Sequence, residues 1–189
     1  MKKTIILIIF ILLFLESNNY KELNSLAIIT NIGIEKTNNK YKVTFQEIIP
    51  VKEENKINKT YKYYTNTSNT IENAFNNLSE DITKEIYLEH LENIIIKDNN
   101  IKTLYNLDNF FKNDLDNFNI VLTETTPKKV LEYGNNYKYV NSIIKDNMTL
   151  KNIKKAKLEH KKIKVPIIKI DNNKLIFYKY KMIGDDKYE

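Results

Sequence analysis

The chain lacks cysteine, arginine and tryptophan, and among its 189 residues are only three glycines, three prolines and two histidines. A protein without cysteine cannot form disulfides, so its stability has to come from its core. Three glycines are too few for a glycine-rich loop that binds phosphate, and no short hydrolase or metalloprotease motif is present. These absences exclude the enzyme classes that are recognised from such motifs.

The absence of arginine bears on the choice of partner. All of the positive charge comes from lysine, and the formal net charge is +6. Arginine most often grips guanine and phosphate with paired hydrogen bonds, and no basic–aromatic motif of an RNA-binding module is present. We therefore expect no nucleic-acid partner. Lysine, asparagine, isoleucine, tyrosine and phenylalanine have AT-rich codons, so a bacterial genome of low GC content explains the charge more simply than a selected basic patch.

The first residues predict export. Lys2 and Lys3 precede an unbroken apolar run at residues 5–15, after which the chain becomes polar. A charged start followed by such a run is typical of a secretory signal or a short anchor. As a helix the run would be about 17 Å long, roughly half of the hydrocarbon core of a bilayer. We assign residues 1–17 as a signal-like or anchor segment.

The stretch at residues 21–50 predicts a β-hairpin. It holds an apolar run from Leu26 to Ile29, a polar corner at Asn38 and Asn39, and then strict alternation of apolar and polar residues. Asparagine tolerates the backbone angles of tight turns, and alternation with period two is the mark of a half-buried strand. We expect a first strand buried on both faces and a second strand with one face in water.

Helix and strand patterns are mixed in the rest of the chain. A charged loop is expected at residues 51–59, strands at 60–67, 92–97, 119–125, 161–170 and 174–180, and helices from 70 to 82, at 101–111, from 126 onward and at 139–153. Asn69 is the expected N-cap of the first helix, with Glu72 as its reciprocal partner. Pro166 predicts an edge or bulge position in its strand.

This order of elements favours an α+β fold, in which several helices pack on a mixed, twisted sheet opened by the hairpin. We divide the chain into the segment 1–17, an α+β domain at 18–158, and a terminal strand pair at 159–189. The strand pair is a candidate start of a truncated second region.

The two histidines are the candidates for catalysis. His90 lies next to Glu89 and Glu92, and these side chains could bind a metal or act as acid and base. The interpretation we prefer is a helix-to-strand junction at which His90 hydrogen-bonds the backbone. His160 lies in a run of lysines, where we expect it to be solvated. We therefore predict no catalytic, cofactor-binding or metal site, and no enzyme activity.

The stretch KELNSLAIITNIGIEKTNNKYKVTFQEIIP resembles the opening of the C subunits of spore germination receptors, the GerAC-like or Ger(x)C proteins. Those proteins begin with Cys-Trp-Asp-x-Arg-Glu-Ile/Leu-Asn-x-Leu-Ala, followed by a Gly-Ile-Asp/Glu turn and a strand ending in Asn-Pro or a relative. The matching positions are Lys21, Glu22, Leu23, Asn24, Leu26, Ala27, Gly33, Ile34, Glu35 and residues 41–50. Later matches follow in the family's order at residues 70–74, 86–96, 165–166, 174–175 and 180–184, so the resemblance covers about residues 21–184.

Two departures from the family matter. Aligning Glu22 with the family's glutamate puts Ser17 at the position of the cysteine that carries the lipid. Attachment of diacylglycerol needs a thiol, so the chain cannot be a conventional lipoprotein. Family members are also much longer, and we interpret the chain as a truncated paralogue, a gene fragment or a split subunit.

The resemblance implies a non-enzymatic subunit of a germinant receptor on the extracytoplasmic side of the spore inner membrane. Its implied partners are the membrane and two membrane-embedded receptor subunits, A and B. One alternative is an unrelated exported module that binds the cell wall or a membrane surface through its lysines. Another is a small exported hydrolase that uses His90 with Glu89 or Glu92, which requires a concave pocket around His90.

Overall fold

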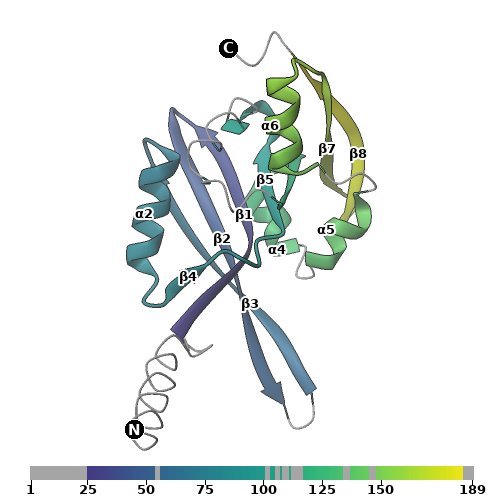
Figure 1. Ribbon diagram of the computed structural model, residues 1–189. Coiled ribbons are helices and arrows are strands. Elements are labelled where there is room, and N and C mark those ends of the chain that lie inside the picture. Colours follow the sequence, from purple (N-terminus) through teal and green to yellow (C-terminus); the bar gives the residue numbers. More distant parts are fainter. Residues whose placement is uncertain are drawn as a thin grey trace, which may run out of the picture.

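The computed structural model describes residues 25–53, 56–100, 103–104, 107, 111, 117–133, 137–144 and 148–184. They form the expected α+β fold, in which helices pack on both faces of one mixed sheet (Figure 1). The strands are β1 (Leu26–Thr37), β2 (Lys40–Glu53), β3 (Lys56–Ser68), β4 (Glu85–Tyr87), β5 (Asn93–Lys97), β6 (Asn119–Thr123), β7 (Ile163–Asp171) and β8 (Lys174–Ile183). The helices are α2 (Ile71–Asp81), the 3-10 turn η3 (Asp98–Asn100), α4 (Pro127–Tyr133), α5 (Tyr137–Ile143) and α6 (Leu150–Leu158).

The strand order in the sheet is β3-β2-β1-β5-β6-β7-β8, with β4 paired to β1 beside this path. The outer strands are antiparallel to their neighbours: β3, β2 and β1 at one edge, and β7 and β8 at the other. The middle strands run parallel, from β1 through β5 and β6 to β7. A parallel strand buried on both faces reads as a continuous apolar run, which is why β5 and β6 were recognisable from sequence.

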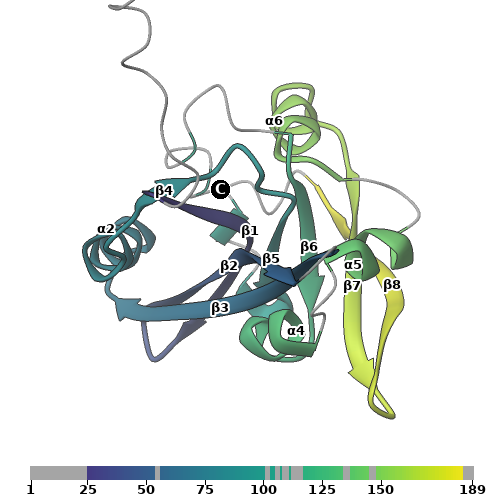
Figure 2. The same ribbon diagram turned by 90° about the horizontal axis from the view of Figure 1, so that it is seen from below.

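Alternate side chains of the sheet enter two cores. The larger core lies under α2 and α6 and includes Ile32, Ile34, Val43, Phe45, Ile94, Ile96, Ile120, Leu122, Ile71, Ala74, Phe75, Leu78, Leu150 and Ile153. The smaller core lies under α4 and α5 and consists of Ile95, Val121, Val130, Leu131, Val140, Ile144, Ile168 and Leu175. Figure 2 shows α6 and α4 on opposite sides of β5 and β6.

The predicted hairpin is present, and Asn38 and Asn39 form its turn with φ angles of 51° and 59°. The first strand is buried on both faces, as expected. The expectation that β2 would show one face to water is wrong for its middle, where Thr44 and Gln46 are buried. The reason is that α4 packs on that face of β1 and β2.

The charged loop predicted at residues 51–59 is also wrong. β2 continues to Glu53 and β3 starts at Lys56, with Val51 paired to Asn58. The two strands extend beyond the rest of the sheet as a two-stranded ribbon (Figure 1). Strand pairing is made by backbone hydrogen bonds, so the charged residues that suggested a loop do not exclude a strand.

Helix α2 follows the predicted apolar stripe, and Ile71, Ala74, Phe75 and Leu78 are buried. The predicted cap is wrong by one residue. Thr70 is the N-cap, and its hydroxyl accepts a hydrogen bond from the backbone N–H of Asn73 at 3.1 Å. The short strand β4 was not predicted.

The single helix predicted at residues 139–153 is instead two helices, α5 and α6. Between them the backbone pairs with the start of β6: the N–H of Ile120 donates to the carbonyl of Met148 at 2.7 Å, and Asn119 forms an isolated bridge with Thr149. This extended pairing ends helical geometry, and Thr149 then caps α6. The chain thereby crosses from the smaller core, which holds Val140, to the larger core, which holds Leu150.

The terminal strands β7 and β8 form as predicted, around a turn at Asn172 and Asn173 with φ angles of 46° and 54°. β7 is an interior strand between β6 and β8, and its register shifts between Ile167 and Ile168. Pro166 therefore lies beside a bulge and not on an edge. The division of the chain at residue 158 stays a prediction.

Other expectations fall on parts that the structure does not describe. The segment 1–17, with Ser17, lies outside the described residues, as does most of the helix predicted at 101–111. Leu104, Leu107 and Phe111 of that helix are described and are buried. In the part of the chain that the structure describes, no helix is long and apolar enough to cross a bilayer.

Candidate functional site: a hollow where two strands separate

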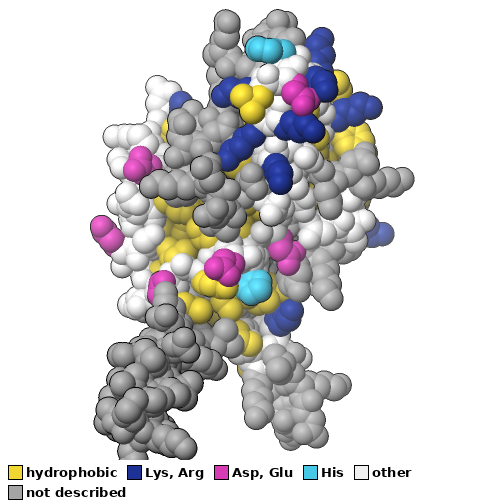
Figure 3. Space-filling view, in the orientation of Figure 1, with side chains coloured by type: hydrophobic (Ala, Val, Ile, Leu, Met, Phe, Trp, Pro, Cys, Tyr) yellow, Lys and Arg dark blue, Asp and Glu magenta, His cyan; other side chains and the backbone are white. Residues whose placement is uncertain are grey.

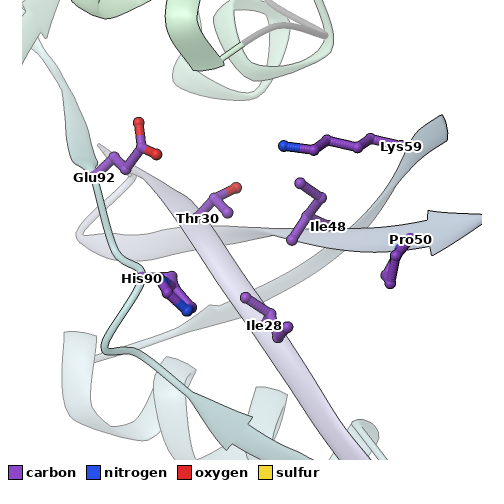
Figure 4. Close-up of a pocket in the computed structure, with 7 residues that line it drawn as sticks. All are labelled: Ile28, Thr30, Ile48, Pro50, Lys59, His90 and Glu92. Atoms are coloured by element: carbon purple, nitrogen blue, oxygen red, sulfur yellow. The ribbon is translucent and has the colours of Figure 1, made fainter. Parts of the chain in front are cut away.

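A hollow lies at the end of the sheet where β1 begins. Pairing between β1 and β2 stops at Ile29 and Glu47, beside a register shift in β1. Beyond this point β2 stays paired with β3, while the first residues of β1 pair with β4. The hollow has a volume of about 310 Å³ and is lined by Ile28, Thr30, Ile48, Pro50, Lys59, His90 and Glu92 (Figure 4).

The hollow has an apolar base and a polar rim. Ile28, Ile48 and Pro50 supply apolar surface from β1 and β2, and Lys59 and Glu92 lie on either side of it (Figure 4). The carboxylate of Glu92 accepts a hydrogen bond from the side chain of Asn141 on α5 at 2.9 Å. Lys59 and Glu92 both make further interactions, so neither side chain is free.

His90 lies in an exposed turn between β4 and β5, not at a helix-to-strand junction as predicted, because the residues before it form a strand. Its ring contacts the ring of Tyr87, with centroids 5.6 Å apart. The hydroxyl of Tyr87 donates a hydrogen bond to the carboxylate of Glu89, which raises the pKa of Tyr87. Glu89 is thus occupied by Tyr87 and does not line the hollow.

The hydrolase alternative required a concave pocket around His90, and the hollow meets that condition of shape. It contains few side chains that could take part in hydrolysis. One imidazole and one carboxylate line it, and that carboxylate is held by Asn141. A general acid and base need two titratable groups in reach of one substrate, so His90 and Glu92 are the pair that this alternative would have to use. Within the described ranges, no group of three or more histidine, aspartate or glutamate side chains could hold a metal ion.

His160, the other histidine, is exposed directly after α6, as predicted, and has a φ of 51°. It is not near the hollow in the sequence or in the sheet order. The structure therefore does not bring the two histidines to one site.

A buried polar network borders the hollow. The side chain of Gln46 accepts a hydrogen bond from Asn31 at 2.5 Å and donates one to the carbonyl of Leu131 at 3.1 Å. Asn93 donates to Asn31 at 2.9 Å, and its own side-chain oxygen has no partner among the described residues. Tyr63 donates to the same carbonyl of Leu131 at 3.1 Å, and burial raises its pKa. The network fixes α4 on the sheet next to the hollow.

Most residues of the hollow could not be identified as site residues from the sequence. Ile28 belongs to a run that reads as core, and Lys59 lies in the stretch taken for a loop. Pro50 gave a weak signal, since proline in a sheet marks an edge or a bulge. The separation of β1 from β2 depends on which strands pair, and a single sequence carries no direct sign of that.

A protein-family model described as the spore germination protein N-terminal domain matches residues 19–162. The chain belongs to this family. The match confirms the resemblance found from the stretch at residues 21–50, and it assigns the protein to spore germination. The matched range contains β1 to α6, including the whole hollow, and ends just before β7. No curated protein and no solved structure gave a significant match.

Proposed function

We propose that this chain is a non-enzymatic subunit of a spore germinant receptor, held at the outer side of a membrane and bound to the membrane-embedded A and B subunits. The observation that carries the proposal is the family match over residues 19–162. The role of such a subunit is to present a folded surface to its partners. Residues 1–17, with two lysines and an apolar run, support export across the membrane or attachment to it.

The geometry of the hollow supports a docking role over catalysis. It is formed by two strands that diverge, its base is apolar, and the carboxylate on its rim is engaged by Asn141. Diverging strands with apolar side chains suit a segment of a partner protein that lies along them. A hydrolytic centre would have to use His90 with the Glu92 carboxylate, which already accepts a hydrogen bond from Asn141.

Co-purification tests this function. The full chain, tagged at its carboxyl end, is expressed in a spore-forming host, and membranes are solubilised in a mild detergent. We expect germinant receptor membrane subunits in the eluate, identified by mass spectrometry. An intact chain that is recovered only from the cytoplasm, without these subunits, would contradict the proposal.

Substitution of each exposed histidine distinguishes a docking role from hydrolysis. For a docking subunit, His90→Ala and His160→Ala should support germination equally in a strain that depends on the tagged chain. If His90→Ala alone abolishes germination while co-purification persists, the hydrolase alternative is favoured.

A further inference from the structure

The lysines of this chain are unevenly placed. Residues 151–162 contain six lysines and one glutamate, whereas the rest of the chain has nearly equal numbers of lysines and acidic residues. Most of the formal net charge of +6 therefore belongs to this short segment. Codon composition would spread lysines along the chain and does not explain their concentration here.

The fold turns this segment into one basic surface, which we call the lysine face. It consists of Lys151, Lys154, Lys155, Lys157, Lys161 and Lys162, on α6 and the turn that follows. Helix α6 buries Leu150, Ile153 and Ala156 against the sheet, so its lysines lie on its other sides. In Figure 3, lysine side chains gather over the end of the molecule that carries α6.

An apolar side chain lies within the lysine face. Leu158, the last residue of α6, is 82% exposed, the highest exposure among the large apolar side chains described as exposed. The single acidic residue, Glu159, pairs with Lys161 at 2.7 Å and with Lys155 at 4.0 Å. One carboxylate offsets only part of the charge of six lysines. A basic surface that also exposes a leucine suits an anionic membrane, which attracts the lysines and can take up the apolar side chain.

We propose that the lysine face binds the surface of an anionic lipid bilayer, with Leu158 entering the interface. The inference rests on the proposed membrane location and adds a second contact with the bilayer to the one proposed for residues 1–17. Lysine suits this partner because it acts as a hydrated point charge, and each lysine near an anionic surface strengthens binding about fivefold. A purely anionic polymer would match the lysines but would leave Leu158 in water.

The proposal also sets an orientation. In Figure 1, α6 lies at the upper end of the molecule and β1 begins at the lower end. A domain attached to a bilayer only through the residues before β1 would turn α6 toward the aqueous side. Contact through the lysine face turns the hollow and the β2–β3 ribbon away from the lipid surface.

Fluorescence tests the contact directly, because the chain contains no tryptophan. The full-length Leu158→Trp variant is mixed with vesicles of phosphatidylcholine alone or with phosphatidylglycerol, some carrying brominated acyl chains. We expect a blue shift and quenching only with the anionic vesicles, and release at high salt. A Tyr133→Trp variant is the matched control, because Tyr133 is 42% exposed on α4, and it should stay unquenched. Quenching of the control alone would overturn the proposal.

Charge variants show whether binding depends on the lysine face or on the net charge of the protein. All variants keep residues 1–17, so a difference between them cannot come from that segment. Lys151→Glu/Lys155→Glu/Lys162→Glu should weaken binding to anionic relative to neutral vesicles at least tenfold. The control Lys40→Glu/Lys129→Glu/Lys174→Glu alters net charge equally at other exposed sites and should bind like the parent. Equal losses of vesicle binding in the two triple variants would show that only net charge matters. Binding to an anionic wall polymer without quenching by lipid would identify a different partner. Either result overturns the proposal. The assay contains no receptor, so its outcome is independent of co-purification.

Discussion

The two faces of the sheet differ in how they are filled. The face under α2 and α6 is largely apolar and includes edge-to-face contacts of Phe75 with Phe45 and Phe111. Its buried carboxylate, Glu47, pairs with Lys84 at 2.9 Å. The face under α4 and α5 has a smaller apolar core and a polar network around Gln46. It also leads into the hollow.

One face of the sheet can therefore supply most of the folding free energy while the other face carries a candidate binding site. Apolar burial contributes free energy in proportion to the area removed from water, so the larger core is expected to dominate the free energy of unfolding. The buried amides on the other face each need a particular partner, so they position α4 more than they stabilise it. Substitutions on the two faces should therefore have effects of different size and kind.

The largest effect is expected from a matched pair of helix leucines. Leu78 on α2 and Leu131 on α4 are both buried, with 0% and 2% exposure. Leu78→Ala should lower the free energy of unfolding by about 4 kcal/mol, and Leu131→Ala by about 2–3 kcal/mol, because a small core bordered by a hollow collapses more easily around a cavity. Urea denaturation measures both values. Equal losses would remove the contrast between the faces.

Replacing the central amide of the network should cost less. Gln46→Leu keeps the volume but leaves the side-chain N–H of Asn31 without its nearest acceptor, so we expect a loss of about 1–3 kcal/mol. Thr44→Val is the control, since Thr44 is also buried but its partner Thr65 is exposed and can bond to water. A loss for Gln46→Leu no larger than for Thr44→Val would show that the network does not contribute.

The approach of α4 to β1 depends on Gly33. A Cβ there would lie 2.9 Å from the Cβ of Pro127 and 3.2 Å from a methyl of Leu131. We expect Gly33→Ala to cost about 1–2 kcal/mol by overpacking, measured by thermal unfolding. Gly184→Ala is the comparison: its Cβ would lie 2.5 Å from Cγ of Lys162, an exposed residue that can turn away, so we expect a smaller cost than at Gly33. A stable Gly33→Ala protein would mean that α4 can move outward freely.

The smallest effect is expected at Tyr63. Tyr63→Phe removes the hydrogen bond that the hydroxyl donates to the carbonyl of Leu131 and the one that it accepts from Gln46 at 3.2 Å. Gln46 still donates to that carbonyl, so only about 1 kcal/mol should be lost at neutral pH. Burial raises the pKa of Tyr63 above its ordinary value of 10.0. The stability due to its neutral form is complete below pH 10 and is lost as the pH rises through the folded-state pKa.

The free energy of unfolding measured at alkaline pH tests this predicted loss of stability. Tyr63→Phe should flatten the fall in the free energy of unfolding above pH 10, whereas Tyr178→Phe, at a tyrosine that is 41% exposed, should not. An unchanged slope in Tyr63→Phe would show that this phenol does not set the alkaline limit.

Several features were predictable because they depend on neighbours in the sequence. Turns with left-handed asparagines at residues 38–39 and 172–173 follow from residue type. The continuous apolar run of β5 and the apolar stripe of α2 follow from periodicity. The family was recognisable from the hairpin stretch for the same reason, since its motifs are local.

The α+β class, the hairpin, most element positions and the family could be predicted from the order of the amino acids. Only the tertiary structure decided that Gln46 is buried, that the chain between α5 and α6 pairs with β6, and that β1 leaves β2 to open a hollow beside His90. Each of these depends on which distant segment satisfies a backbone or side-chain hydrogen bond. A local pattern states what a residue prefers, and the neighbour that supplies its partner is chosen only when the whole sheet assembles.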